Sequence, residues 1–242
     1  MIERSAGLPG SVVHGFTDRL GGASEGRYAT LNLGRRWGDD TAAVAENYRR
    51  VAEAGGFRRE TLRMARQVHG ATVLRARDLE TDSEADALWV HRDDAPLVVG
   101  VLTADCVPLL LVDAAGTVAA AVHSGWKGTV ANIAGAAVRA LEEQVPAHTL
   151  VAAIGPCIEV AAFEVGEEVA TQFAPEFVRR AGFVRPHVDL VATVTAQLVA
   201  AGVSLGAISR VGGCTCSEPG RYFSYRRDGA GIGQMLAFIG FG

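Results

Sequence analysis

The chain has 242 residues, of which 49% are apolar and 21% are charged, a composition typical of globular proteins. Its formal charge of −4 at pH 7 excludes a general nucleic-acid binder, because such proteins need a basic surface that displaces counterions from phosphates. No apolar run reaches the roughly 18 residues that span a bilayer, and the first residues lack the pattern of a signal peptide. We therefore expect a cytoplasmic protein without nucleic-acid or membrane partners.

The first third of the chain combines loops with one helix. No repeat, charge block or Pro/Ser-rich linker divides the sequence, so residues 1–242 are predicted to form one domain. Residues 11–38 are rich in Gly and polar side chains, which predicts loops around short strands. In residues 41–54 apolar and charged side chains alternate at helical spacing, which predicts a helix with Asp39 or Asp40 as its N-cap.

Several short apolar runs in the middle of the chain predict strands. Residues 71–76 form the first, and the runs 96–102 and 107–112 are β-rich and continuous, as expected for strands buried on both faces. A turn at residues 114–116 leads into a further run at 118–122, which ends at His123. If the last two runs pair as a hairpin, the start of one strand lies near the end of the other.

The second half of the chain mixes helices and strands. Helices are predicted at residues 129–144, 167–173 and 188–201, and strands at residues 150–154, 207–211 and 233–239. Strands and helices do not alternate strictly as in βαβ units. We therefore expect an α+β fold with a mixed sheet.

Three residues have local contexts that favour chemistry. The four cysteines are too few and too irregularly spaced for a disulfide framework, which leaves their thiols free for metal or catalytic work. His69 lies in Q-V-H-G, Cys106 follows T-A-D, and His123 precedes S-G-W-K-G. Their spacing fits no zinc-finger pattern. Converging at a sheet end, they would form a His₂Cys set that leaves one position of a four-coordinate metal open, which is the catalytic pattern.

Other interpretations of these residues stay open at this stage. Cys106 is also compatible with a small core residue, and the histidines with hydrogen-bonded surface groups. In a third interpretation Cys106 is a nucleophilic thiolate with His123 or His69 as its base. Sequence does not separate nucleophile from ligand, because both need a deprotonated sulfur. A structural role is expected for the remaining cysteines, and a surface or capping role for the other histidines: Cys157, Cys214, Cys216, His14, His91, His148 and His187.

Two segments are candidates for binding an anion. The stretch S-G-W-K-G-T at residues 124–129 opens a predicted helix, whose amides and dipole favour a phosphate, and Lys127 adds a positive charge. Arg226 and Arg227, in Y-F-S-Y-R-R-D, form a second candidate. A plain glycine turn and a structural salt bridge are the corresponding alternatives.

Ordered sequence blocks along almost the whole chain resemble a known family. They include G-G-A-S-E-G-R-Y-A-T-L-N-L from Gly21, Q-V-H-G from Gln67, A-D-A-L from Ala85, T-A-D-C-V-P-L-L-L-V-D from Thr103, A-V-H-S-G-W-K-G-T from Ala121 and C-T-C…Y-F-S-Y-R-R-D from Cys214. The chain is similar to the laccase-domain (polyphenol oxidase) family, which is also described as YfiH-like purine nucleoside phosphorylases and as peptidoglycan editing factors.

The resemblance implies a fold, an activity and a site. The fold would be a four-layer α/β/β/α arrangement, and the activity would be phosphorolysis of adenosine, inosine and methylthioadenosine together with adenosine deamination. His69, Cys106 and His123 would hold a metal, usually zinc, with copper possible. The partners would be a purine nucleoside and phosphate, and the protein a monomer or weak homodimer.

The cations for phosphate are a further expectation. Lys127, Arg49 or Arg226 would position the phosphate against the ribose and stabilise developing charge. The family commonly has arginine where this chain has Lys127, and alanine where it has Ser124. Lysine neutralises a phosphate but lacks the bidentate fork of arginine, so we expect weaker phosphate binding if that position grips it.

Two rival functions remain at the level of sequence. A copper-dependent polyphenol oxidase needs several histidine clusters, whereas this chain has six histidines and no H-x-H pair. A peptidoglycan editing factor, or a Cys-His hydrolase acting on muropeptides, would use the same three residues as a zinc enzyme.

Overall fold

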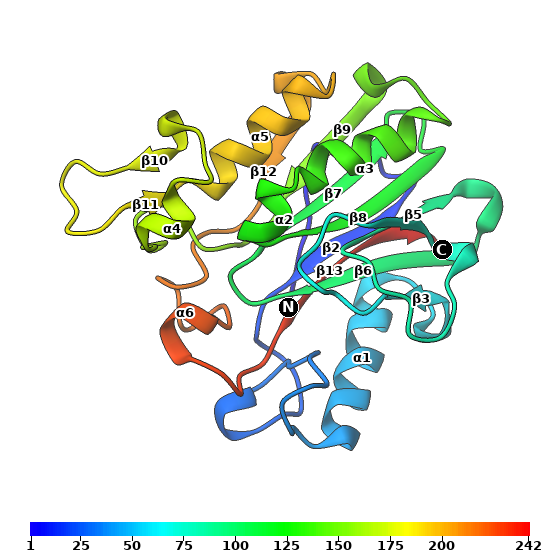
Figure 1. Cartoon of the computed structure of the whole chain (residues 1–242). Helices are drawn as coiled ribbons and strands as arrows, with labels where there is room; N and C mark the ends of the chain where they lie inside the picture. Colours follow the sequence, from blue (N-terminus) through cyan, green and yellow to red (C-terminus); the bar gives the residue numbers. More distant parts are fainter.

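The computed structural model describes residues 1–242, and its strands form two main sheets that pack face to face. Helix α1 (Thr41–Gly55) covers the outer face of one sheet, and α3 (Ile133–Glu142) and α5 (Leu190–Ala200) cover the outer face of the other (Figure 1). Both sheets contain parallel and antiparallel pairs. The α+β class expected from the sequence and the four-layer α/β/β/α arrangement implied by the family resemblance are therefore confirmed.

The first sheet has five strands, and its last strand in sequence lies at its centre. The spatial order is β1 (Ile2–Glu3), β2 (Val13–Thr17), β13 (Met235–Phe241), β6 (Leu97–Thr103) and β3 (Leu62–Arg63). Strand β13 pairs antiparallel with both β2 and β6, and all its residues are buried. Helix α1 begins after Asp40, whose side chain accepts a hydrogen bond from the Ala42 amide, so the predicted helix and one of its two predicted caps are confirmed.

The second sheet has six strands and contains the predicted hairpin. The spatial order is β12 (Ile208–Arg210), β9 (Leu150–Ile154), β7 (Val107–Asp113), β8 (Val118–Ser124), β5 (Ala87–His91) and β4 (Val73–Arg75). Strands β7 and β8 pair antiparallel, with Pro108 opposite His123. The start of β7 therefore lies beside the end of β8, as the sequence predicted.

Shorter elements complete the chain. These are the helices α2 (Trp126–Val130), α4 (Glu167–Ala170) and α6 (Tyr225–Asp228), the strands β10 (Val178–Arg179) and β11 (His187–Val188), and the 3-10 helices η1 (Gly26–Tyr28), η2 (Arg59–Thr61), η3 (Ala76–Asp78), η4 (Arg92–Asp94), η5 (Ala147–Thr149), η6 (Pro175–Phe177) and η7 (Leu205–Ala207). No helix combines the length and the apolar character needed to cross a membrane.

Two helix predictions are wrong in extent. The predicted helix at 129–144 is two helices, because Asn132 adopts a left-handed conformation (φ 59°) and its side chain accepts the Gly135 amide to cap α3. Asparagine tolerates this conformation better than most residues. The helix predicted at 167–173 is a single turn, since α4 ends at Ala170.

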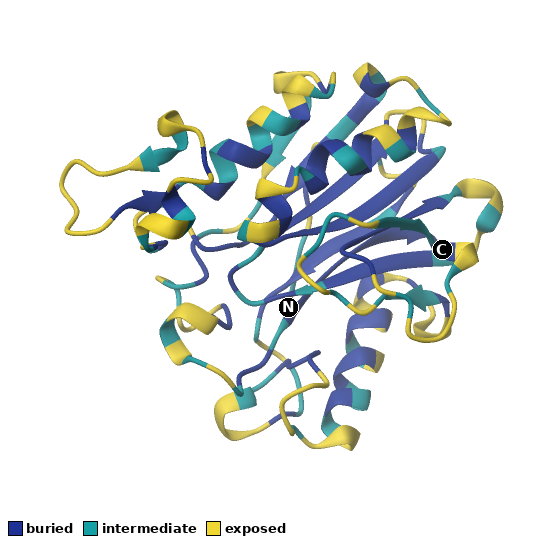
Figure 2. Ribbon diagram, in the orientation of Figure 1, coloured by how far each residue is buried: buried dark blue, intermediate teal, exposed yellow.

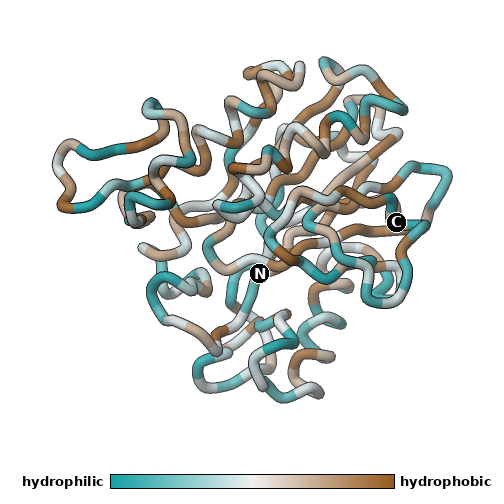
Figure 3. The backbone as a smooth tube through the Cα atoms, in the orientation of Figure 1, coloured by the Kyte–Doolittle hydropathy of each residue, from teal (hydrophilic) through white to brown (hydrophobic).

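Side chains of the central strands are buried on both faces. Along β7, Leu109 and Leu111 point toward the α3–α5 layer, whereas Leu110 and Val112 pack between the two sheets. Figure 2 shows these strands as a continuous buried centre, and Figure 3 shows their hydrophobic character against polar loops. Burial on two faces explains why the sequences of these strands are continuously apolar.

Candidate metal centre and its cleft

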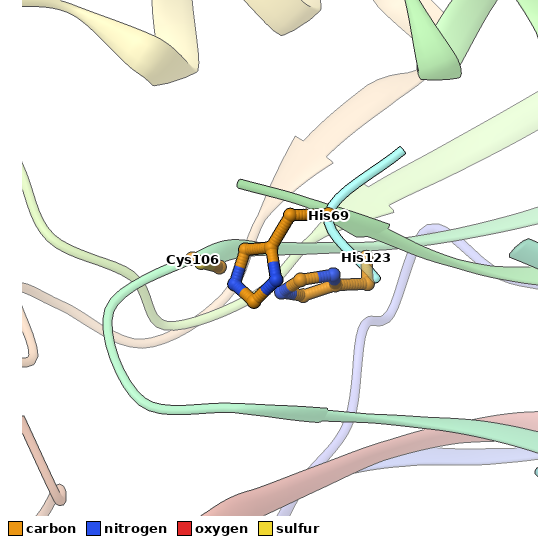
Figure 4. Close-up of side chains that lie close together, drawn as sticks. All are labelled: His69, Cys106 and His123. Carbon is orange, nitrogen blue, oxygen red and sulfur yellow. The ribbon is translucent and has the colours of Figure 1, made fainter. Parts of the chain in front are cut away.

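His69, Cys106 and His123 converge at one end of the six-stranded sheet (Figure 4). Their ligand atoms all lie within 4.8 Å of one another. The two imidazole rings meet edge to face, with centroids 4.8 Å apart and an interplanar angle of 83°. His123 is buried, Cys106 is half-buried and His69 is exposed, so the group is accessible from one side. The structure thus brings together the three residues that the sequence selected.

Asp86 organises this group, and sequence reasoning assigned it no role. It precedes β5 and is fully buried. Its carboxylate accepts the backbone amides of Val68 (3.2 Å), His69 (3.0 Å) and Gly70 (2.6 Å). These bonds hold the loop in which His69 adopts a left-handed φ of 61°.

The same carboxylate orients His123. Nδ1 of His123 lies 2.8 Å from Oδ1 of Asp86, and when Nδ1 is the donor of a neutral imidazole the lone pair lies on Nε2. Burial by itself raises the pKa of the Asp86 carboxyl, but hydrogen bonds from His123 and the Gly70 amide outweigh it and hold this pKa below its usual value. A carboxylate behind a histidine is the usual support of a metal-ligating imidazole.

The surroundings of Cys106 favour the thiolate form of its side chain. Burial works to raise the pKa of its thiol, yet the imidazoles of His123 and His69 prevail and lower this pKa below its ordinary range. Against the effect of burial, the Cys106 thiolate and the Asp86 carboxylate raise the pKa of His123. One thiolate and two imidazoles are ligands that zinc prefers, and three protein ligands leave a position for water or substrate. The donor set therefore fits such a metal.

The loop that carries Cys106 is fixed by the C-terminal part of the chain. Asp105 adopts φ 97°, a conformation that non-glycine residues rarely take. Its Oδ1 accepts the Thr215 hydroxyl at 2.6 Å, and its Oδ2 accepts the Arg226 amide at 2.6 Å. These two bonds stabilise an unfavourable backbone conformation directly beside the thiol.

Gly125 leaves room for the group. A Cβ atom at this position would lie 3.0 Å from Sγ of Cys106 and 3.0 Å from Cδ2 of His69. We expect Gly125→Ala to displace both side chains and to lower metal affinity by about tenfold or more. Metal retained after dialysis against a chelator measures the effect, with Gly220→Ala, where a Cβ meets open space, as the matched control. Equal metal retention in the two variants would contradict this prediction.

The three residues lie in the wall of a large cleft with a volume of about 1470 Å³. Its lining combines aromatic side chains and six arginines with four carboxylates: Trp37, Trp126, Phe163, Tyr225, Arg35, Arg36, Arg59, Arg66, Arg185, Arg226, Glu80, Asp82, Asp105 and Glu164. Trp37 and Tyr225 are exposed, and their ring centroids lie 6.1 Å apart. The cleft therefore offers flat apolar surfaces and positive charge beside the candidate metal ligands.

The predicted phosphate-binding cations differ in their placement. Arg226 lines the cleft, and its Nη1 donates to the carbonyl oxygens of Ala162 and Glu164. Arg49 is exposed on α1 and forms ion pairs with Glu46 and Glu53, outside the cleft.

Lys127 also lies outside the cleft lining. It is exposed on α2, with its ammonium 5.5 Å from the centroid of the Trp126 ring. In the same turn the hydroxyls of Ser124 and Thr129 hydrogen-bond to each other at 2.8 Å. Arg227, the second arginine of Y-F-S-Y-R-R-D, pairs with Asp228 and donates to backbone carbonyls, as a structural salt bridge would.

The other cysteines and histidines are separate from the metal group. Cys157 and Cys214 lie on adjacent backbone segments in the core, and burial raises the pKa of Cys157 to about 11. His91 is the N-cap residue of η4, in agreement with the capping role expected from the sequence. His14 and His187 are buried rather than on the surface, and each hydrogen-bonds to a backbone carbonyl oxygen, that of Ser5 and that of Val160 respectively. The structure contains one His/Cys group of this kind.

Comparison with known proteins places the chain in a family. Residues 13–242 match the family described as multi-copper polyphenol oxidoreductase laccase. A purine nucleoside phosphorylase of Deinococcus radiodurans is 41% identical over 95% of this chain and 89% of its own length. Purine nucleoside phosphorylase SCO2081 of Streptomyces coelicolor is 42% identical over 93% of each chain. The crystal structure of YlmD from Geobacillus stearothermophilus has a TM-score of 0.88 at 33% identity, covering 98% of this chain and 94% of that one. The chain therefore belongs to the multi-copper polyphenol oxidoreductase laccase family.

Proposed function

We propose that the protein is a metal-dependent purine nucleoside phosphorylase that also deaminates adenosine. The observation that carries the proposal is the His69–Cys106–His123 group in the wall of a cleft with aromatic and cationic lining. We propose these three residues as ligands of zinc, with copper as the alternative metal. The names of the Deinococcus and Streptomyces relatives support phosphorolysis.

A zinc ion bound by these ligands would supply a Lewis acid at an open coordination position. The chain's own residues would orient the metal ligand His123, bind the purine and neutralise the phosphate. Asp86 keeps His123 in one orientation, through the 2.8 Å contact to Nδ1. The rings of Trp37 and Tyr225 present flat faces that suit a purine. Arginines of the cleft neutralise phosphate where charge develops during cleavage of the glycosidic bond.

The test is an assay of the metal-loaded protein on adenosine with and without phosphate. Phosphorolysis releases adenine only when phosphate is present, whereas deamination yields inosine without phosphate. Methylthioadenosine, which keeps the purine and changes the ribose 5′ position, tests the breadth of the substrate class. Folded, metal-loaded protein that releases neither adenine nor inosine would rule the proposal out.

The two rival functions predict different results in assays of the same metal-loaded protein. A polyphenol oxidase would consume oxygen in proportion to bound copper rather than zinc. A muropeptide hydrolase would cleave a muropeptide substrate and leave nucleosides intact. Either result, in the absence of purine release, would replace the proposed activity.

A further inference from the structure

Three arginines without a hydrogen-bonded partner line the cleft that contains the metal group. Arg35, Arg36 and Arg59 line it, and none of these guanidinium groups donates to a carboxylate or a carbonyl oxygen. The remaining arginines of the cleft each have a protein partner: Arg66, Arg185 and Arg226. All three unpaired arginines are exposed to solvent. Positive charge without a protein partner in a cleft indicates a site for an anionic group.

Two of the three arginines, Arg35 and Arg59, come from separate segments that meet near Tyr48. Arg35 lies over the Tyr48 ring, with its guanidinium carbon 4.8 Å from the ring centroid. Burial raises the pKa of Tyr48 to about 12, and the positive charges of Arg35 and Arg59 oppose this rise. Both arginines therefore act on the same hydroxyl, although one precedes α1 and the other follows it.

The backbone under both segments is anchored. Asn32 Oδ1 accepts the amides of Gly34 (2.8 Å) and Gln234 (2.9 Å), which ties the segment before Arg35 to the segment before β13. In η2 the Thr61 hydroxyl donates to the Arg58 carbonyl at 2.7 Å. Arginines on a fixed backbone lose less conformational entropy when they bind a ligand.

We propose that Arg35, Arg36 and Arg59 form the phosphate-binding subsite of the cleft. The phosphate group is either free inorganic phosphate or the 5′-phosphate of a nucleoside monophosphate, and guanidinium groups bind its oxygens through paired, charge-assisted hydrogen bonds. This inference rests on the proposed function for the identity of the second substrate. It moves the phosphate contact away from Arg49 and Lys127, which lie outside the cleft, to residues that no motif had indicated.

The experiment compares metal-loaded wild type, the double variant Arg35→Gln/Arg59→Gln, and Arg58→Gln. Arg58 is the matched control, because it is an exposed neighbour of Arg59 that does not line the cleft. Calorimetric titration with inorganic phosphate alone, at fixed ionic strength, measures the subsite without a nucleoside. We expect the affinity for phosphate to fall by about tenfold or more per arginine removed, the size of a charge-assisted hydrogen bond. Arg58→Gln should bind phosphate as the wild type does.

A second titration separates the two sources of phosphate. If the subsite takes a monoester, AMP binds more tightly than adenosine, and this advantage disappears in the double variant. If it takes free phosphate, AMP has no advantage, and in the phosphorolysis assay the KM for phosphate rises while the KM for adenosine is unchanged. Either pattern supports the subsite.

Two results would overturn the subsite. One is equal affinity of wild type and double variant for both phosphate and AMP. The other is an equal loss in Arg58→Gln, which would indicate a general charge effect. Failure of the proposed function is distinguishable, since wild type would then bind phosphate through these arginines without cleaving any nucleoside. All variants must keep the wild-type Tm. We expect this because the substituted side chains of Arg35, Arg58 and Arg59 are exposed.

Discussion

Cys106→Ala should yield folded protein that no longer retains stoichiometric metal and has lost its purine-releasing activity. The thiolate is the one sulfur ligand of the group, and two imidazoles alone leave a weak site. Loss of Lewis-acid stabilisation worth several kcal/mol corresponds to a rate lower by roughly a thousandfold or more. Metal analysis and the adenosine assay, run on the same preparation, measure both effects.

Cys216→Ala is the matched control for this substitution. Cys216 is half-buried like Cys106, but it does not line the cleft. The control should keep metal and activity. A Cys106→Ala protein that retains metal would show that sulfur is not a ligand. Absence of metal from wild type, combined with loss of activity in Cys106→Ala, would favour a thiol nucleophile with a histidine base.

Asp86→Asn should lower metal affinity by about 10–100-fold while every proposed ligand remains in place. An amide cannot match the carboxylate as acceptor for His123 and for three backbone amides, so the imidazole loses its fixed orientation and the His69 loop its anchor. Competition with a chromophoric chelator measures the affinity directly. The Tm of the variant should fall as well, because a buried acceptor network is weakened.

Asp94→Asn separates loss of stability from loss of the site. The Asp94 side chain is also largely buried and binds Arg75 at 2.9 Å, but it does not line the cleft. This variant should lose stability and keep wild-type metal affinity. If Asp86→Asn loses stability alone, Asp86 supports the fold rather than the metal site.

The hairpin accounts for the part of the site's geometry that sequence could predict, whereas His69 was selected from its local sequence context alone. Cys106 and His123 flank β7 and β8, and two apolar runs joined by a short turn are enough to bring them together. The role of Asp86 does not follow from the hairpin. Asp86 precedes β5, which the sequence patterns did not predict as a strand, and the pairing of β5 with β8 joins segments far apart in sequence. An aspartate between Ala85 and Ala87 was a usable signal, since a buried carboxylate needs partners.

The layers of the fold depend on contacts that local patterns do not encode. Strands β6 and β7 are separated by only three residues, 104–106, yet they belong to different sheets. Their apolar runs are alike because both strands are buried on both faces. The four-layer arrangement was therefore predicted from family resemblance and not from periodicity. By contrast, the break of the 129–144 helix had a local signal in Asn132, which is favoured in the left-handed conformation.

The central position of β13 also decides when this protein can fold during synthesis. Strands β2 and β6 share no hydrogen-bonded neighbour until residues 235–241 leave the ribosome and insert between them. The Cys106 loop also depends on the C-terminal part of the chain, because the Asp105 side chain accepts hydrogen bonds from Thr215 and Arg226 that stabilise its backbone conformation. A nascent chain whose residues 215–241 are still inside the ribosome therefore has neither a complete first sheet nor a complete site.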